Sequence, residues 1–472
     1  MGPMQNTKMY EGRQPKASEG TPVHVCVRGV AGLDGAVSAP ASSSACLAAM
    51  AAALLAGGST TIENPPDCGE VRHMEAVLRS MGLGVRRTLG GAIEVETRNS
   101  LHPEPEYSLC AELDASMLLL GPLLAKWGEA RIALPRTGGI DHLPLQQLIK
   151  GLRAMDAEVR VEHGYVVAKA KPLRGARIYL DVPRAEATTT LMTAAALAVG
   201  VTVIENAALD PEVVDVANML GLMGADVRGA GSATIRVAGV RELRPVSYSV
   251  IPDRIEASLL LGAALSCGGR VRVTDVIPSH LEAVLSKFVE AGASVARGSD
   301  WVETGWDKLR PLSALKVRST AYPGFPACLQ PLFAALMCRA RGVSVIADPG
   351  SDWPYPFADE LRRMGACARV EGRSLLVDGP RDVTSAKVRA TGFFTGAALM
   401  VFAIGTPGVT TVYAPDSLAA SFKGFASRLS RLARGARAVV VCGARSSSRV
   451  RATTATGSNC VLMDNGRRCT DD

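Results

Sequence analysis

The most constraining feature of this sequence is one supersecondary unit that occurs six times. Each copy opens with a helix pattern of small and apolar residues that runs into glycine and then into a β-rich stretch. Each copy closes with an amphipathic helix pattern, a turn and a β-hairpin pattern, although the sixth closing part is degraded. The copies follow one another at roughly 70 residues, which exceeds the period of solenoid repeats. The six openings are residues 44–66, 115–135, 186–208, 255–278, 325–350 and 394–416.

The opening and closing helix patterns differ in where their apolar residues lie. Opening helices such as 191–200 are apolar on nearly every face, which is typical of helices in the middle of a domain. Closing helices carry charges opposite one apolar stripe, as Leu281, Val284, Leu285 and Phe288 illustrate, so we expect them on the outside. Three units then enclose three buried helices within a ring of sheets.

The length of the chain favours two domains. Its 472 residues are too many for one hydrophobic core, and six units divide evenly into two groups of three. We predict an α/β fold with one lobe at residues 42–250 and a second lobe at 23–41 plus 251–437. The polar residues 1–22 and the Ser-, Thr- and Arg-rich residues 438–472 are expected to be largely disordered tails.

Composition argues against a membrane protein and against a nucleic-acid-binding protein. No apolar run reaches about 18 residues without a glycine or a charge, as a membrane span requires. The net charge of +7 is distributed along the chain, and aromatic residues make up only 4%. The 11 cysteines include no Cys-x-x-Cys pair, which predicts free thiols in a reducing cytoplasm and neither a metal site nor a cofactor. No pattern points to a protein partner.

The shared orientation of the buried helices suggests a site for an anion. Helix N-termini carry unpaired N–H groups and a partial positive charge, so several that converge between two lobes favour a phosphorylated small molecule. Ser43 and Ser44 at the first buried helix and Asp114 before the second lie at this place. Serine and aspartate also cap helices in any protein, and the sequence alone favours that simpler interpretation.

Several local strings, together with the order of the units, resemble the enolpyruvyl transferase family, and within it the enzymes that use UDP-N-acetylglucosamine. The resemblance runs from about Val23 to about Ala436. It implies a two-lobed inside-out α/β barrel with three units in each lobe and a ligand cleft between the lobes. The strings are LGPLLAKWGEARIALP (120–135), VIENAALDPEVVDVAN (203–218), PDRIE (252–256), HLEAVLSKFVEAGA (280–293) and PGFP (323–326) with Gln330.

The resemblance also implies a reaction. These enzymes transfer the enolpyruvyl group of phosphoenolpyruvate to the 3′-hydroxyl of UDP-N-acetylglucosamine and release phosphate, in the cytoplasmic synthesis of a peptidoglycan precursor. Thr188 and Arg254 keep residue types that the family has, so the resemblance implies that they bind substrate. For Arg254, a structural ion pair is at least as strongly favoured.

Cations with which the family holds phosphoenolpyruvate are replaced in this chain. Ser43 stands at the position of a family lysine, and a serine hydroxyl binds an anion without neutralising it. Loss of one such electrostatic group commonly lowers a rate by about 10²–10³. Asp114 reverses the charge of an arginine before the second buried helix. Further arginines of the family correspond to Leu143, Phe394 and either Ser417 or Ala420.

Two proton carriers of the family are also replaced. Gly138 falls at the position of a loop cysteine that acts as general acid, and Asp141 can serve only if the loop register shifts. The simpler interpretation is that Asp141 and His142 are solvated loop residues. Cys328 stands at the position of an aspartate that acts as base, and a thiol with a pKa near about 8.5 stays mostly protonated at neutral pH. Losing general-base help typically lowers a rate by about 10²–10⁴.

Three hypotheses for function remain open. The first is an enolpyruvyl transferase that acts on UDP-N-acetylglucosamine or another nucleotide sugar. The second is a non-catalytic nucleotide-sugar-binding or regulatory protein on the same scaffold. The third is an enzyme repurposed to another substrate in specialised biosynthesis, with Arg136, Asp141, His142 and Lys423 as the first candidate groups. Because cations and proton carriers are replaced together, we predict that the family reaction is impaired.

Overall fold

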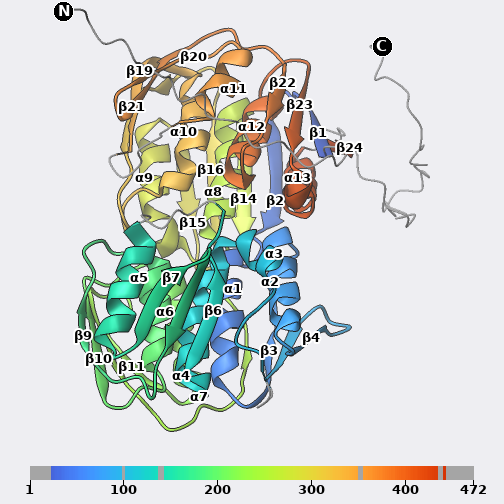
Figure 1. Ribbon diagram of the computed structural model, residues 1–472. Helices are drawn as coiled ribbons and strands as arrows, with labels where there is room; N and C mark the ends of the chain where they lie inside the picture. The colour runs from blue at the N-terminus through green and yellow to red at the C-terminus, as the bar shows by residue number, and fades with distance from the viewer. Residues whose placement is uncertain (1–22, 98–100, 137–142, 349–354, 434–438, 443–472) are drawn as a thin grey trace, which may run out of the picture.

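Two hydrophobic cores organise the molecule, as a computed structural model of the chain shows. One core is formed by residues within 45–250, and the other by residues within 25–39 and 255–433. Figure 1 shows the two parts stacked, and we call them the lower half and the upper half as they are drawn there. The structure describes residues 23–97, 101–136, 143–348, 355–433 and 439–442.

Six helices lie mostly or wholly inside these cores. Their sequences are rich in Ala, Leu, Met and Gly, whose small or flexible side chains pack on every face of a helix. In the upper half these helices are α8 (Arg254–Cys267), α10 (Gln330–Met337) and α12 (Phe393–Ile404). In the lower half they are α1 (Ser43–Ala52), α4 (Leu120–Trp127) and α6 (Ala185–Ala195).

Amphipathic helices follow the buried ones along the chain. The predicted stripe of Leu281, Val284, Leu285 and Phe288 is wholly buried in the upper core. These helices are α2 (Gly69–Ser80), α5 (Leu143–Ala154), α7 (Pro211–Met223), α9 (Glu282–Glu290), α11 (Ala358–Arg363) and α13 (Ala419–Leu432), with a short α3 (Tyr107–Ala111). Short 3₁₀ turns are η1 (Ala53–Leu55), η2 (Asp114–Leu119), η3 (Pro278–Leu281), η4 (Ala327–Leu329) and η5 (Asp416–Leu418).

The strands form six separate sheets, and none of these sheets closes into a barrel within the described residues. In the lower half the orders are β13 (Ser247–Tyr248), β3 (Gly58–Ile62), β5 (Ile93–Thr97), β4 (Gly84–Arg87); β6 (Glu129–Ala133), β8 (Tyr165–Lys169), β7 (Glu158–Glu162); and β11 (Asp226–Arg228), β12 (Thr234–Ala238), β10 (Val201–Glu205), β9 (Arg177–Tyr179).

The upper half contains the other three sheets. One of them has β18 (Lys316–Arg318) as an additional partner of β19. The orders are β15 (Ser294–Arg297), β16 (Trp301–Trp306), β14 (Gly269–Thr274), β2 (Leu33–Ser38); β17 (Leu312–Ser313), β19 (Ala340–Ala347), β21 (Ser374–Gly379), β20 (Cys367–Glu371); and β22 (Lys387–Arg389), β23 (Val409–Ala414), β1 (Val23–Arg28), β24 (Val439–Cys442).

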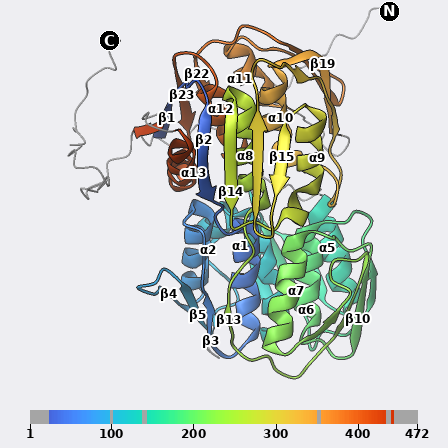
Figure 2. The same cartoon turned by 180° about the vertical axis from the view of Figure 1, so that it is seen from behind.

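The chain crosses between the halves twice, and the two crossing segments lie side by side. The described part starts in the upper half, where β2 pairs with β14 in the parallel orientation (Figure 2). The backbone N–H of Ser42 donates to the carbonyl of Ile251 at 2.8 Å, and that of Asp253 donates to the carbonyl of Pro40 at 2.8 Å. The two halves are therefore joined by a short hydrogen-bonded ribbon, which we call the crossing.

A strand lies within the segment 438–472 that we expected to be largely disordered. Val439–Cys442 forms β24, which pairs antiparallel with β1 and sets Val441 opposite Val25. Three consecutive valines favour an extended conformation, and β1 offers an edge with which they pair. The prediction rests on the composition of the whole segment, which does not indicate these four residues, and for the rest of the segment it stays a prediction.

In each half, a cationic side chain donates hydrogen bonds to backbone carbonyls near the C-terminal ends of buried helices. The ammonium of Lys126 donates to the carbonyls of Leu54 and Ala56 at 2.9 and 2.5 Å. In the upper half, the guanidinium of Arg339 donates to the carbonyl of Phe402 at 3.4 Å. Carbonyl groups at helix ends lack partners within the helix, so a cation at this place is favourable.

The aromatic centre of the upper core gives a test of its packing. Phe288 is fully buried and stacks on Phe333 with ring centroids 5.3 Å apart. We expect Phe288→Ala to lower the free energy of unfolding by about 3–5 kcal/mol, because it leaves a cavity in a packed core. Val289, the next residue of α9, is 56% exposed, so Val289→Ala should change stability by less than about 0.5 kcal/mol. Urea unfolding of both variants measures the difference, and equal effects would contradict the packing.

Candidate functional site

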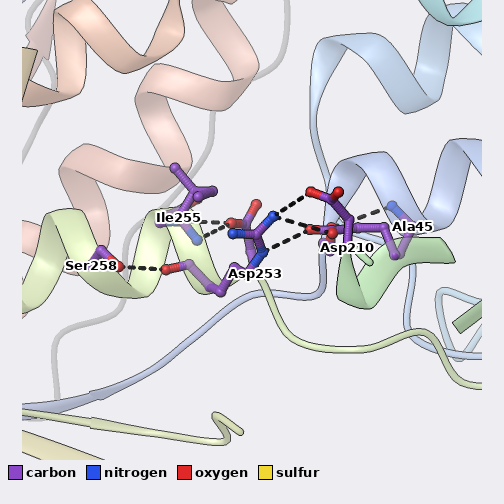
Figure 3. Close-up of polar contacts among 9 residues, drawn as sticks. Ala45, Asp210, Asp253, Ile255 and Ser258 are labelled. Carbon is purple, nitrogen blue, oxygen red and sulfur yellow. Dashed lines mark hydrogen bonds and ion pairs between the residues drawn. The ribbon is translucent and has the colours of Figure 1, made fainter. Parts of the chain in front are cut away.

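The crossing gathers several of the residues that the sequence predicts to bind a ligand. Ser43 opens α1 beside it, and Arg254 opens α8 beside it. Ser42 is the cap of α1, because its hydroxyl accepts a hydrogen bond from the N–H of Ala45 at 3.3 Å (Figure 3). Ser44 is exposed, so its side chain is open to a ligand.

The carboxylate of Glu70 lies near the start of α1 and is influenced by two other carboxylates. The hydroxyl of Ser43 is hydrogen-bonded to the carboxylate of Glu70, in the first turn of α2. Part of the Glu70 side chain reaches solvent, yet the protein around the carboxyl removes enough water to raise its pKa. The bond from Ser43 lowers that pKa, and the charges of Asp114 and Asp253 raise it. The surroundings of Ser43 are therefore acidic, which disfavours a phosphate beside it.

Arg254 joins the two halves through an ion cluster that consists of Asp210, Glu212 and Arg254 (Figure 3). Its Nη2 lies 3.2 Å from Oδ1 of Asp210, and its Nε lies 3.2 Å from Oε1 of Glu212. Both carboxylates lie at the start of α7, where a helix favours negative charge. The Arg254 side chain is only 12% exposed, so its charge depends on these partners.

Cys328 lies in η4, beside Arg254 and Asp253. Burial raises the pKa of its thiol to about 12, and this effect exceeds the lowering caused by the charge of Arg254. The charge of Asp253 raises the pKa further. The thiol is therefore protonated at neutral pH and has little power to accept a proton from a sugar hydroxyl.

Thr188 is covered by protein at the start of α6. Its side chain is fully buried, and its hydroxyl accepts a hydrogen bond from the N–H of Ala208 at 3.0 Å. This bond fastens α6 to the segment that leads into α7. The structure thus gives Thr188 a role in holding that segment, and contact with a ligand requires the cover to move.

Aromatic side chains lie at the start of α12, where the resemblance implies an arginine. Phe393 packs near Phe422 and Phe425 of α13, with ring centroids 6.1 Å from each. Phe394 lies next to it and is 37% exposed. This helix start therefore offers an apolar ring to a ligand, where a guanidinium would grip a phosphate.

A small hollow of about 20 Å³, partly open to solvent, adjoins Arg254 on the upper half. Tyr322 covers one side of Arg254, with its ring centroid 5.0 Å from the guanidinium carbon. The walls of the hollow come from the start of α8, the turn before α9 and the segment that leads to Cys328. The polar lining residues are Arg254, Ser258, Ser279, His280, Glu282 and Tyr322.

Several site predictions lie outside the described residues, and some participants were not predicted. Gly138, Asp141 and His142 fall within 137–142, so their roles stay predictions. Glu70 was not predicted, and its only sequence signal is an acidic residue in the first turn of a helix. Asp210 and Glu212 were not predicted as site residues, and nothing in their spacing indicates that Arg254 reaches them from the other half.

Among the residues that the structure describes, no helix is both long and apolar enough to cross a membrane. In the same residues, no group of three or more His, Cys, Asp or Glu side chains is arranged to hold a metal ion.

A buried ion pair supports α8 just behind the site. Glu256, 6% exposed, pairs with Arg428 of α13. The pKa of Glu256 is raised from 4.5 to about 7, mainly because burial disfavours the charged carboxylate. The charge of Arg428 lowers this pKa, and the charge of Asp253 raises it. Through Arg428, this pair connects the outer helix α13 to the buried helix α8.

Comparison of the sequence with known proteins finds relatives over most of the chain. A profile of EPSP synthase (3-phosphoshikimate 1-carboxyvinyltransferase) matches residues 27–429. UDP-N-acetylglucosamine 1-carboxyvinyltransferase 3 of Caldanaerobacter subterraneus subsp. tengcongensis is 39% identical over 390 residues, which are 82% of this chain and 92% of that protein. UDP-N-acetylglucosamine 1-carboxyvinyltransferase 2 of Symbiobacterium thermophilum is 40% identical over 387 residues, 82% of this chain and 91% of that protein.

Solved structures with the same fold cover most of this chain. The enolpyruvyl transferase NikO from Streptomyces tendae superposes with a TM-score of 0.78 at 24% identity, covering 89% of this chain and 99% of that one. EPSP synthase from Acinetobacter baumannii superposes with a TM-score of 0.67 at 18% identity, covering 89% of this chain and 100% of that one. At these identities, the likeness concerns the fold alone.

The pKa of Glu256 makes the stability of the protein depend on pH. The folded state keeps a proton on Glu256 up to about pH 7, whereas the unfolded state releases it near 4.5. The free energy of unfolding of the wild type should therefore fall, relative to Glu256→Gln, as pH rises from 4.5 to about 7. Urea unfolding across this range measures the difference. Glu282→Gln, in an exposed ion pair with Arg297, is the control, and a pH-independent difference for Glu256→Gln would contradict the assignment.

Proposed function

Because this chain belongs to the EPSP synthase family of enolpyruvyl transferases, we propose that it binds UDP-N-acetylglucosamine between its two halves and carries out the family reaction slowly. In that reaction the enolpyruvyl group of phosphoenolpyruvate moves to the 3′-hydroxyl of the sugar, and phosphate is released, in the cytoplasmic synthesis of a peptidoglycan precursor. One observation supports UDP-N-acetylglucosamine as the acceptor of the enolpyruvyl group. Over at least 80% of its length, this chain is similar to proteins named UDP-N-acetylglucosamine 1-carboxyvinyltransferase.

The proposal includes a two-lobed architecture that places the ligand. One lobe comprises residues 42–250, and the other comprises 23–41 with 251–437, each an inside-out α/β barrel of three units. The two hydrophobic cores, the six buried helices and the six open sheets support this division. The ligand would lie near the crossing, where the buried helices α1 and α8 begin.

The slow rate follows from the charges at that place. Phosphoenolpyruvate carries a phosphate and a carboxylate, and Glu70, Asp114 and Asp253 would repel it. Ser43 can donate a hydrogen bond but supplies no positive charge, and its hydroxyl is already bonded to Glu70. Cys328, protonated at neutral pH, is a poor base for the sugar hydroxyl. Electrostatic stabilisation and proton transfer are thus weakened together.

A second candidate is a protein that binds a nucleotide sugar. It would bind the nucleotide sugar alone or together with a second small molecule that is less charged than phosphoenolpyruvate. The exposed ring of Phe394 at the start of α12 favours this alternative, because a ring packs on an apolar group and repels none of the ligand's charge. On this alternative the chain is either a non-catalytic binding protein or an enzyme repurposed to another substrate.

A kinetic assay tests the main proposal. With saturating phosphoenolpyruvate and UDP-N-acetylglucosamine, we expect phosphate release at least about 100-fold below the typical ~10 s⁻¹ of enzymes. Turnover near ~10 s⁻¹ would overturn the expected impairment. Calorimetry with each ligand alone separates the alternatives: binding of the sugar nucleotide without phosphate release favours a binding protein, and no binding of either ligand favours another substrate.

Substitution of Cys328 tests why the rate is low. We expect Cys328→Asp to raise the rate of phosphate release by about tenfold or more, because a carboxylate accepts the proton of the sugar hydroxyl and a neutral thiol does not. Cys328→Ala is the matched control and should leave the residual rate unchanged. If Cys328→Ala abolishes that rate, the thiol itself takes part, and the explanation from its raised pKa is wrong.

A further inference from the structure

We propose that Arg254 is a positioning residue, which sets the placement of the two halves through Asp210 and Glu212 and so tunes the affinity for a ligand that contacts both halves. The resemblance implies that this arginine binds substrate. The ion cluster instead indicates that Arg254 connects the two halves. The part of this proposal that concerns ligand affinity rests on the proposed function, whereas the part that concerns the placement of the halves does not.

The contacts of the guanidinium carry the first step. Its Nε and Nη2 are both used by the lower half, with a further Nη2 contact to Oε2 of Glu212 at 3.3 Å. Exposed fractions of 12% for Arg254, 22% for Asp210 and 14% for Glu212 show that all three charges are largely withdrawn from water. Charges withdrawn in this way attract one another more strongly than surface pairs, which water screens.

The position of Arg254 in its own helix carries the second step. It is the first residue of α8, and a cation at a helix N-terminus is opposed by the helix dipole. Asp253 compensates for this locally, since its carboxylate accepts from the N–H groups of Ile255 and Glu256 at 2.9 Å each. Helix α8 alone therefore gives no reason for an arginine at this place, whereas the carboxylates of the other half do.

The neighbours of the ion cluster carry the third step. Tyr322 packs its ring against Arg254 and belongs to the segment that leads into η4 and Cys328. On the lower half, Asp215 of the same helix α7 accepts from the hydroxyl of Tyr248 at 2.6 Å, shortly before the chain enters the crossing. Helix α7 is thus tied both to the crossing and, through Arg254, to the segment that bears Cys328.

The crossing by itself permits rotation between the halves. Its two crossing segments are joined by a single bridge, Ala41 with Pro252, and by two backbone hydrogen bonds. A ribbon this narrow acts as a hinge, and hinges are a few residues at the ends of elements. Arg254 lies at one end of this hinge, where an ion pair to the opposite half limits its rotation.

Hydrogen exchange and X-ray scattering test the placement of the halves without any ligand. We expect Arg254→Met to speed amide exchange in residues 38–45 and 246–256 by about tenfold and to enlarge the radius of gyration. The double variant Asp210→Asn with Glu212→Gln keeps the size of the side chains and should act in the same direction. Arg297→Met, which breaks an exposed ion pair of the upper half, is the control and should leave both readouts unchanged.

A charge swap distinguishes positioning from ligand binding. We expect Arg254→Glu to weaken the affinity for UDP-N-acetylglucosamine by about tenfold or more, and Arg254→Glu with Glu212→Arg to recover most of that loss. A guanidinium that binds the ligand directly is not replaced by one on the other helix. The proposal is overturned if the swap recovers nothing, or if Arg254→Met and the double variant both exchange and scatter like the wild type. If the wild type itself does not bind UDP-N-acetylglucosamine, the proposed function fails, while exchange and scattering still decide on Arg254.

Discussion

Enclosure of helices that are apolar on every face is the constraint on which the rest of this structure depends. In α8, each residue from Ile255 to Cys267 is buried, so no side of the helix is available to water or to a ligand. Sheets and amphipathic helices must therefore surround it, and only its two ends can take part in chemistry. The candidate site lies at the N-terminal ends of such helices, and Lys126 and Arg339 close the opposite ends.

The electrostatics of those N-terminal ends separates this chain from what its resemblance implies. Helix starts supply partial positive charge, but the carboxyl groups of Glu70, Asp114 and Asp253 lie at the same place, and the charges of Asp114 and Asp253 raise the pKa of Glu70. Arg254, which the resemblance implies as a substrate-binding cation, is already paired with two carboxylates. On the proposed function, recognition of a ligand there would depend more on shape, hydrogen bonds and aromatic contact than on attraction of opposite charges.

Much of the fold could be predicted from the sequence, because the local spacing of apolar residues indicates which helices are buried and which face of an outer helix packs on the core. All-round apolar patterns predicted the buried helices, and the spacing of Leu281, Val284, Leu285 and Phe288 predicted the buried face of an outer helix. The site was harder to predict, since its contacts join residues far apart in sequence. Glu70 reaches Ser43 from another helix, and the partners of Arg254 lie in the other half. Thr188 was predicted to bind substrate, but it is fully buried and accepts a hydrogen bond from the N–H of Ala208 that no pattern indicates.

The entry of the chain through the upper half has a consequence for synthesis on the ribosome. Strands β1 and β2 emerge before the lower half, yet β2 pairs with β14, which begins at Gly269, and β1 pairs with β23, which begins at Val409. At about 5–20 residues per second, β2 waits roughly 10–50 s for its partner. The lower half has all its segments by then and can fold first. Two unpaired, valine-bearing strands are thus displayed on a nascent chain during that interval, when chaperones would shield them from pairing with other proteins.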